Sequence, residues 1–340
     1  MSIRRFLTTT ALAALASWLA SAEAQAGYTF QNVINPADVT FNQLLGVNNS
    51  GLITGYFGSG AVGFPNQGYT YSGGGAFTST NFPGSTQTQV TGLNNNGTLV
   101  GFWAPTNMGG DANYGFYEQG GVFSTVVNPN TTSAPPVNQL LGVNDSNVAV
   151  GFYNDNNNNA HGYTYNITTG TFTPVISTLP NVASLTAAGI NNAGDIVGFY
   201  STVTGGPANG FLDIGGTFTT LDAPGSTSTM LLGVNNKGLI VGTDTDANGM
   251  HGVIYNELTQ SWTVLDAFGT NANFTTFNGL NDLGQIVGFY TTDGGNGNTI
   301  GLLVSAPAPE AGKGVLGLAL LVLAGAAARA RGLPARFSAD

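Results

Sequence analysis

A six-residue phrase recurs six times along this 340-residue chain, and it constrains the fold more than any other feature. Each copy begins with Gly, continues with Val, Leu or Ile, and then carries Asn followed by Asn or Asp. The copies lie at residues 46–51, 92–97, 142–147, 189–194, 233–238 and 279–284. Their leading glycines are 46, 50, 47, 44 and 46 residues apart. A period of this length indicates one supersecondary unit that is copied along the chain.

Each repeat predicts four short β-strands. The phrase supplies the end of the first strand and a turn, in which Asn accepts a backbone hydrogen bond and the last Gly adopts positive φ. The second strand has a Gly at its middle, which indicates a bulge or a close backbone approach; these glycines are Gly55, Gly101, Gly151, Gly198, Gly242 and Gly288. The fourth strand centres on an aromatic residue, which is Phe77, Phe123, Phe172, Phe218 or Trp262.

Only five fourth strands follow the six repeats, and the missing one lies at the N-terminus. Residues 30–36 align without gaps with the fourth strand at 218–224. A chain that begins with a fourth strand and ends with a third closes a ring, whereas an open solenoid needs capped ends. We therefore predict an all-β fold in which residues 27–306 form a six-bladed β-propeller closed by the N-terminal strand. An irregular β-solenoid or two stacked sheets is the alternative.

The N-terminal 26 residues predict a secretory signal peptide. Arg4 and Arg5 form a basic start, a mostly apolar stretch follows, and Ala24-Gln25-Ala26 offers a site for cleavage after Ala26. The repeats are therefore expected outside the cytoplasm. The chain has no cysteine, so an exported domain of this kind depends on its packed core rather than on disulfides.

The C-terminal end has three parts. Residues 307–314 form a linker, 315–328 are apolar and predict one transmembrane helix, and 329–340 form a basic tail that is expected in the cytoplasm. The apolar part reaches only about 21 Å as a helix, so flanking small residues must help it cross a core of ~30 Å. This arrangement resembles the PEP-CTERM sorting signal, with Pro309 and Glu310 matching the motif and Ala311 in place of its second Pro. The resemblance implies recognition by an exosortase-type membrane peptidase; a plain C-terminal anchor is the alternative.

Charge excludes several partners. Within residues 27–306 Lys237 is the only Lys or Arg, and it stands against fourteen acidic residues, which leaves a net charge of −13 with both histidines neutral. A body without arginine cannot neutralise phosphates, so nucleic acids and anionic membrane surfaces are excluded as partners.

The repeats themselves resemble the bacterial extracellular HAF repeats. The shared pattern is Gly-Ile-Asn-Asn-x-Gly-x-Ile-Val-Gly, and it runs through the whole of 27–306. The triplet that names these repeats is only partly kept, as His161-Gly162-Tyr163 and His251-Gly252-Val253. The resemblance implies export and a repeat architecture. It implies no activity, since none is established for the family.

One loop predicts a metal site. Asp244, Asp246 and Asn248 place oxygen ligands at alternate positions and are followed by a Gly, as at the start of a calcium-binding loop. Tyr255 stands where an EF-hand has its bidentate Glu, so the loop is incomplete. Calcium is the only cofactor that the sequence suggests, and a solvated loop without metal is the alternative.

No catalytic constellation is recognisable. His161 and His251 share one register, which favours an imidazole that binds a loop carbonyl over a catalytic base. The carboxylates are scattered, with Asp145 and Asp282 at turns where the other repeats have Asn. We therefore expect a non-catalytic module. The resemblance to PEP-CTERM proteins implies that it lies at the surface of a Gram-negative bacterium and binds exopolysaccharide or a surface protein. The alternatives are a polysaccharide hydrolase or lyase with carboxylates in the channel, and an adhesion module stiffened by calcium.

Overall fold

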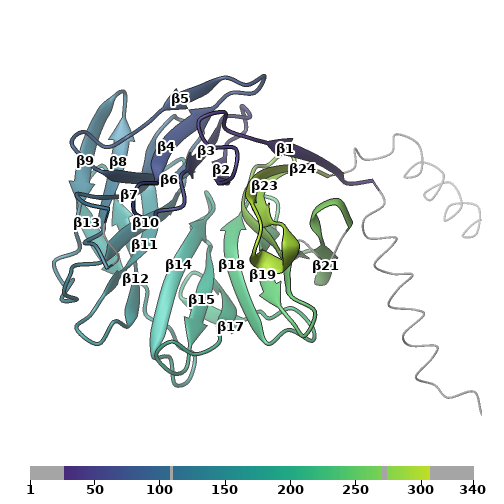
Figure 1. Ribbon diagram of the computed structural model, residues 1–340. Coiled ribbons are helices and arrows are strands. Elements are labelled where there is room, and N and C mark those ends of the chain that lie inside the picture. Colours follow the sequence, from purple (N-terminus) through teal and green to yellow (C-terminus); the bar gives the residue numbers. More distant parts are fainter. Residues whose placement is uncertain (1–26, 108–109, 270–273, 307–340) are drawn as a thin grey trace, which may run out of the picture.

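The computed structural model describes residues 27–107, 110–269 and 274–306. Within them the chain forms six antiparallel four-stranded sheets that surround a central channel (Figure 1). The prediction of a six-bladed all-β propeller is confirmed, and the solenoid and the stacked sheets are excluded. No helix among these residues is long and apolar enough to cross a membrane. The predicted signal peptide with Ala26, the linker with Pro309 and Glu310, the transmembrane segment 315–328 and the tail 329–340 lie outside the described residues.

Five blades are built from consecutive strands, which follow one another from the channel outward. They are β2 (Asn42–Val47), β3 (Ile53–Phe57), β4 (Gln67–Tyr71) and β5 (Phe77–Ser79); β6 (Gln87–Leu93), β7 (Leu99–Ala104), β8 (Tyr114–Gln119) and β9 (Val122–Val126); β10 (Asn138–Val143), β11 (Val148–Asn154), β12 (Ala160–Asn166) and β13 (Thr171–Pro174); β14 (Ser184–Ile190), β15 (Ile196–Ser201), β16 (Asn209–Ile214) and β17 (Thr217–Thr220); and β18 (Ser228–Val234), β19 (Leu239–Thr245), β20 (Met250–Asn256) and β21 (Ser261–Leu265). Two short 3₁₀ turns, η1 (Ala267–Gly269) and η2 (Asp293–Gly295), lie in loops.

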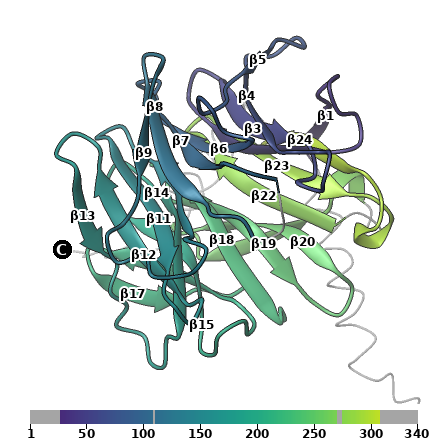
Figure 2. The ribbon, with the colours of Figure 1, turned by 60° about the vertical axis from the view of Figure 1, so that its left-hand side comes forward.

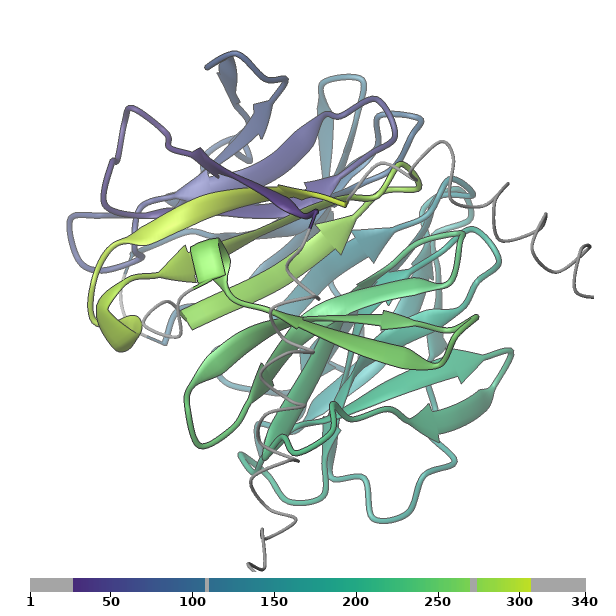
Figure 3. The same cartoon turned by 90° about the vertical axis from the view of Figure 1, so that its right-hand side faces the viewer.

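The sixth blade joins the two ends of the body. It is formed by β22 (Phe274–Leu280), β23 (Gln285–Thr291), β24 (Thr299–Ser305) and the N-terminal β1 (Thr29–Val33). β1 pairs antiparallel with β24, so that Phe30 lies opposite Val304, and Figure 3 shows the purple first strand along the yellow last one. Figure 2 labels the four strands of this closing blade. β22 in turn contacts β2 of the first blade. The predicted closure by the N-terminal strand is therefore confirmed.

Every innermost strand has a β-bulge at the same place. In β2 the register with β3 shifts between Leu44 and Gly46, and the other five innermost strands repeat this shift. The mid-strand glycine of the second strand lies directly beside the bulge. A Cβ on Gly198 would lie 2.0 Å from the carbonyl oxygen of Thr186, which is far inside contact distance. These glycines are thus explained by close backbone approach, as their mid-strand position predicts.

The hydrophobic core lies between neighbouring blades. One cluster joins Val100 and Val126 of the second blade to Leu140 and Tyr163 of the third, and the other interfaces have similar clusters. The aromatics of the fourth strands pack on those of the third strands, for example Phe172 on Tyr165 with ring centroids 4.7 Å apart. Burial of these side chains, at roughly 25 cal/mol per Å² of apolar surface, is the main force that holds adjacent blades together.

Candidate functional site

The turns that follow the innermost strands narrow one end of the channel, which we call the neck. The first Asn of each phrase is buried there, and its side-chain Nδ2 donates to the backbone carbonyl of the equivalent Asn in the next blade. This pattern runs from Asn48 through Asn94, Asn144, Asn191, Asn235 and Asn281 back to Asn48, at 2.9–3.4 Å. Six bonds therefore close a complete ring around the channel.

A second ring lies beside the first and is formed by the next residue of each phrase. Its backbone N–H donates to the side-chain Oδ1 of the equivalent residue in the next blade, at 2.8–2.9 Å. The members are Asn49, Asn95, Asp145, Asn192, Asn236 and Asp282. The two aspartates are three blades apart, on opposite sides of the ring. Sequence reasoning assigned these residues to their own turns and missed both rings.

The two neck carboxylates are held in their ionised form. Asp145 Oδ2 accepts from the amides of Asn95 and Asn192, at 2.9 and 2.7 Å. Burial raises the pKa of Asp145, but these hydrogen bonds outweigh it and keep the pKa below its ordinary value. Asp282 is bound in the same way by Asn49 and Asn236, and its pKa is lowered for the same reasons. A general acid in a glycosidase needs a raised pKa, so neither carboxyl is suited to that role.

A ring of glycines forms the next layer of the channel. They are the leading residues of the six phrases: Gly46, Gly92, Gly142, Gly189, Gly233 and Gly279. A Cβ on Gly189 would lie 3.0 Å from the Cα of Gly233 and 3.0 Å from the carbonyl oxygen of Leu232. Neighbouring innermost strands thus meet backbone to backbone, and any side chain here would push them apart. The channel spaces at the neck and at this layer measure only about 70 and 90 Å³, well below the ~300 Å³ of a typical ligand pocket.

The channel widens at the starts of the innermost strands to a cavity of about 220 Å³, which we call the mouth. Three glutamines from the first three blades, Gln43, Gln89 and Gln139, line one arc of it. Each is oriented by a residue behind it: Gln43 Oε1 accepts from the Tyr56 hydroxyl, at 2.8 Å. The amides of Gln89 and Gln139 donate to Asn66 and Asn113, at 2.8 and 2.9 Å.

The rest of the mouth is mainly apolar. Its lining is completed by Leu45, Thr91, Phe102, Leu141, Ala188, Leu232 and Asn278. The oriented glutamines leave an amide nitrogen of Gln43 and carbonyl oxygens of Gln89 and Gln139 without a hydrogen-bond partner among the described residues. An uncharged wall with a few fixed amide groups and several apolar side chains is suited to a neutral, hydroxyl-rich ligand. The sequence held a signal for this site, since each Gln stands three residues before a leading glycine.

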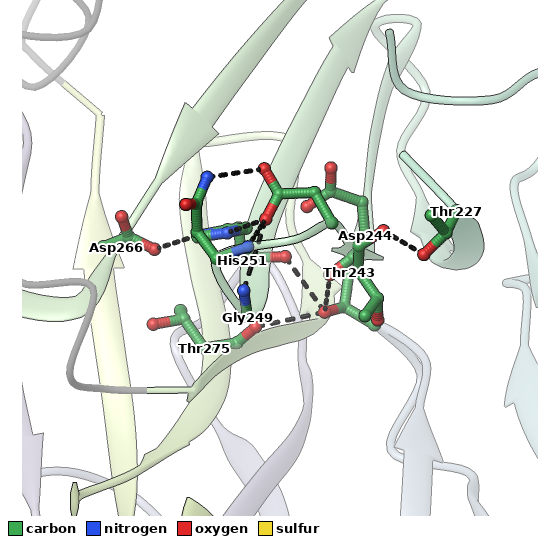
Figure 4. Close-up of polar contacts among 10 residues, drawn as sticks. Thr227, Thr243, Asp244, Gly249, His251, Asp266 and Thr275 are labelled. Carbon is green, nitrogen blue, oxygen red and sulfur yellow. Dashed lines mark hydrogen bonds and ion pairs between the residues drawn. The ribbon is translucent and has the colours of Figure 1, made fainter. Parts of the chain in front are cut away.

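The candidate metal loop lies in the fifth blade, where Asp244 belongs to the end of β19 and Asp246 and Asn248 to the turn between β19 and β20 (Figure 4). Asp246 caps its own loop: Oδ1 accepts from the backbone N–H of Asn248 at 2.6 Å, and Oδ2 accepts from the Asn248 amide at 3.1 Å. Asp244 is 5% exposed, and its Oδ1 has no hydrogen-bond partner within the part of the chain that the structure describes. Among the residues that the structure describes, no group of three or more His, Cys, Asp or Glu is placed to hold a metal ion. The calcium site at Asp244, Asp246 and Asn248 stays a prediction.

His251 connects this loop to the linker after β21. Its Nε2 lies 3.1 Å from Asp246 Oδ1, and its Nδ1 lies 2.7 Å from Asp266 Oδ1 (Figure 4). The hydrogen bond to Asp266 is the largest of the effects that raise the pKa of His251 to about 9. Burial raises the pKa of the neighbouring Asp244 to about 6. The imidazolium and the surrounding carboxylates thus form a closed ionic cluster with the His side chain only 9% exposed.

The expectation that both imidazoles bind a loop carbonyl is wrong. His161 Nε2 lies 3.1 Å from Asp155 Oδ2, and so both histidines of the chain bind carboxylates. The physical reason is that the loop between the second and third strands folds back on itself. It thereby brings an aspartate that lies five or six residues earlier in the sequence onto the ring. The spacing of these residues in the sequence did not predict that the loop folds back on itself.

Comparisons with known proteins support the architecture. No family model matches the chain, and no curated protein matches its sequence. Among solved structures, one of unknown function from Dyadobacter fermentans is similar at a TM-score of 0.52 and 14% identity, over 83% of this chain and all of that one. A protein called TolB from Agrobacterium tumefaciens has a TM-score of 0.50 at 11% identity, over 82% and 98% of the two chains. AofleA from Arthrobotrys oligospora has a TM-score of 0.49 at 13% identity, over 82% of this chain and 86% of that one. The support for the architecture comes from the first two structures, whose TM-scores are 0.52 and 0.50, and it concerns the fold alone.

Proposed function

We propose that this chain is an exported, non-catalytic binding module whose channel mouth holds a neutral segment of exopolysaccharide. The observation that supports it is the chemistry of the mouth, where Gln43, Gln89 and Gln139 present fixed amide groups beside apolar side chains. Sugars combine hydroxyl groups with apolar C–H faces, and such a wall matches both. With a net charge of −13 in the body, a neutral glycan is favoured over an acidic one.

The positions of the body's two ends are consistent with display at a surface. Thr29 at the start of β1 lies opposite Ser305 at the end of β24, and the following Ala306 donates to the carbonyl of Gly284, just after the Asp282 turn at the neck. A tail that continues from residue 306 therefore leaves from the neck side. If the PEP-CTERM-like segment is held at the membrane by an exosortase-type peptidase or as an anchor, the mouth points outward, toward the matrix.

The hydrolase or lyase alternative has less support in the channel. Its two neck carboxylates, Asp145 and Asp282, are each bound by two amides and have lowered pKa values. Asp244 does have a raised pKa of about 6, but it is buried beside His251 and does not line the mouth. The calcium-stiffened adhesion module depends on the loop at Asp246, whose oxygens already accept hydrogen bonds from that loop.

Calorimetry of the purified protein against the polysaccharide secreted by the producing organism tests the proposal, with calcium and with a chelator. We expect saturable heat that does not depend on calcium. A Gln89→Ala/Gln139→Ala double variant should lose the heat, whereas Asn95→Ala at the neck should keep it. Heat that survives in the double variant would place the site elsewhere. No heat from the unmodified protein would exclude the glycan and leave a protein partner or a purely structural role.

A further inference from the structure

A second cavity lies between the third and fourth blades and takes no part in the channel. It measures about 280 Å³, which is larger than the mouth. Its walls come from the third blade, the linker that follows it and the start of β14, and they include Tyr153, His161, Val175, Ile176, Ser177 and Leu185. This volume is close to the lower end of small-ligand pockets.

The fifth blade has a histidine at the place equivalent to His161, and there the imidazole is enclosed by two carboxylates. The strand registers make His161 equivalent to His251. His161 lies opposite Tyr153 and His251 lies opposite Asp244, and each of these partners stands two residues after the mid-strand glycine of its second strand. The two histidines also bind equivalent aspartates through Nε2, Asp155 and Asp246. In the fifth blade Nδ1 binds Asp266 (Figure 4).

The third blade lacks that last partner. Tyr163 pairs with Pro174 as Val253 pairs with Val264, so Asp266 corresponds to Ile176. Ile176 is 75% exposed and offers no acceptor. His161 Nδ1 therefore has no hydrogen-bond partner among the described residues. Its side chain is 44% exposed, against 9% for His251.

The imidazole of His161 is nevertheless held in place. Asp155 accepts from the backbone N–H groups of Asn157 and Asn159 at 2.8 and 3.0 Å, and it lies 3.1 Å from His161 Nε2. The hydrogen bond to His161 is the main cause that lowers the pKa of Asp155 to about 2. The ring also stacks on Tyr153, with centroids 5.1 Å apart and planes at 21°. In the tautomer that donates from Nε2 to Asp155, Nδ1 carries no proton and is a hydrogen-bond acceptor.

The other residues that line the cavity limit the chemical class of ligand that it can bind. Tyr153 and Ser177 are hydroxyl-bearing residues of the lining, and Val175, Val182 and Leu185 are apolar ones. The body has no arginine, and its one lysine, Lys237, lies in the turn between β18 and β19 of the fifth blade, so neither residue type supplies a countercharge for an anion here. The carboxylate of Asp155 is already engaged. A neutral molecule with hydroxyl groups and an apolar face fits these constraints.

We propose that the cavity between the third and fourth blades binds a single neutral sugar unit, with His161 Nδ1 accepting a hydrogen bond from one of its hydroxyl groups. The site lies apart from the mouth and takes its ligand class from the proposed function. A polysaccharide could therefore be held at two places on one molecule, which strengthens binding through effective concentration.

Histidine NMR tests this directly because the chain has only two histidines. The imidazole ¹⁵N resonances of the purified protein are followed at pH 8 while methyl glycosides of glucose, galactose, mannose and rhamnose are added separately. We expect at least one of them to shift the His161 resonances in a saturable way and to leave those of His251 unchanged. If none shifts His161, or if both histidines shift alike, the proposal is wrong.

Substitution of Ile176 provides a second test, with its own matched control. Ile176→Asp supplies a carboxylate where the fifth blade has Asp266, at an exposed position where the change should not disturb folding. It should bind His161 Nδ1 and weaken the glycoside at least tenfold, while Ile176→Val should bind as the unmodified chain does. Unchanged binding in Ile176→Asp would overturn the assignment. The Gln89→Ala/Gln139→Ala variant should keep the His161 shift, so failure at the mouth and failure at this cavity can be told apart.

Discussion

The buried amide ring at the neck leads to a quantitative prediction for Asn94→Ala. Asn94 is 3% exposed, and its Nδ2 donates to the carbonyl of Asn144 at 2.9 Å and to Asn147 Oδ1 at 3.1 Å. Its Oδ1 accepts from the N–H groups of Asn96 and Thr98, at 3.0 and 2.9 Å. A net hydrogen bond contributes about 1 kcal/mol, and a buried group left unpaired costs about 1–3 kcal/mol. Since water reaches part of this turn, we expect a loss of about 3 kcal/mol in the free energy of unfolding.

The adjacent residue is a matched control. Asn95 also bonds to neighbouring blades, through its Oδ1 to the N–H of Asn49 and through its Nδ2 to Asp145. It is exposed, however, so water replaces the bonds that Asn95→Ala removes, and we expect a loss below about 1 kcal/mol. Urea unfolding of both variants, followed by circular dichroism, measures the two values.

Equal losses in Asn94→Ala and Asn95→Ala would refute the reasoning, because burial of the first ring is what separates them. A third variant, Asn94→Asp, keeps the acceptor for the turn but replaces the donor with a carboxylate oxygen that faces the Asn144 carbonyl. It should destabilise the protein at least as much as Asn94→Ala does. A stability near that of the unmodified protein would show that the bond between blades contributes little.

Three further changes have defined outcomes. Gly198→Ala places a Cβ 2.0 Å from the Thr186 carbonyl, and since overpacking costs about 1–3 kcal/mol or more, thermal unfolding should show a large drop in Tm or no folded protein. The folded pKa of His251, about 9, lies above the unfolded value of ~6.5, so its stabilisation is complete below pH 6.5 and is lost as the pH rises through 9. Tm should therefore fall between pH 6.5 and 10, and His251→Gln should flatten this slope; a parallel slope in both proteins would contradict the assignment. Calcium or a chelator should leave Tm unchanged, because the loop at 244–248 caps itself; a rise with calcium would restore the adhesion hypothesis.

Much of the fold could be predicted because its determinants are local and repeated. Alternating β-branched and aromatic residues, turn asparagines and glycines are properties of short segments, and copying them six times sets the number of blades. The match between residues 30–36 and 218–224 was enough to predict closure. The N-terminal segment is a fourth strand without a blade of its own, and the last blade lacks a fourth strand. The six glycines predicted at the middle of the second strands all lie within those strands.

The candidate sites could not be predicted in the same way, because they depend on contacts between repeats. The leading glycines appear in sequence as strand ends, yet Gly189 is required by the backbone of Gly233, one blade away. The turn asparagines were assigned to their own turns, and their second role appears only when six blades close a ring. Which side chains face the channel depends on the bulge in each innermost strand, so the glutamines of the mouth were overlooked.

The two histidines show most clearly how much the sequence by itself can predict. Their shared register determined that His161 and His251 occupy equivalent places in two blades, and the repeat alone was sufficient for that. Only the tertiary structure decided that one is enclosed by Asp266 while the other faces a cavity beside Ile176. The physical reason is that the periodicity of a repeat encodes position within a blade. The environment of a side chain is set by the linker and the neighbouring blade that pack against it, and these parts of the sequence do not repeat.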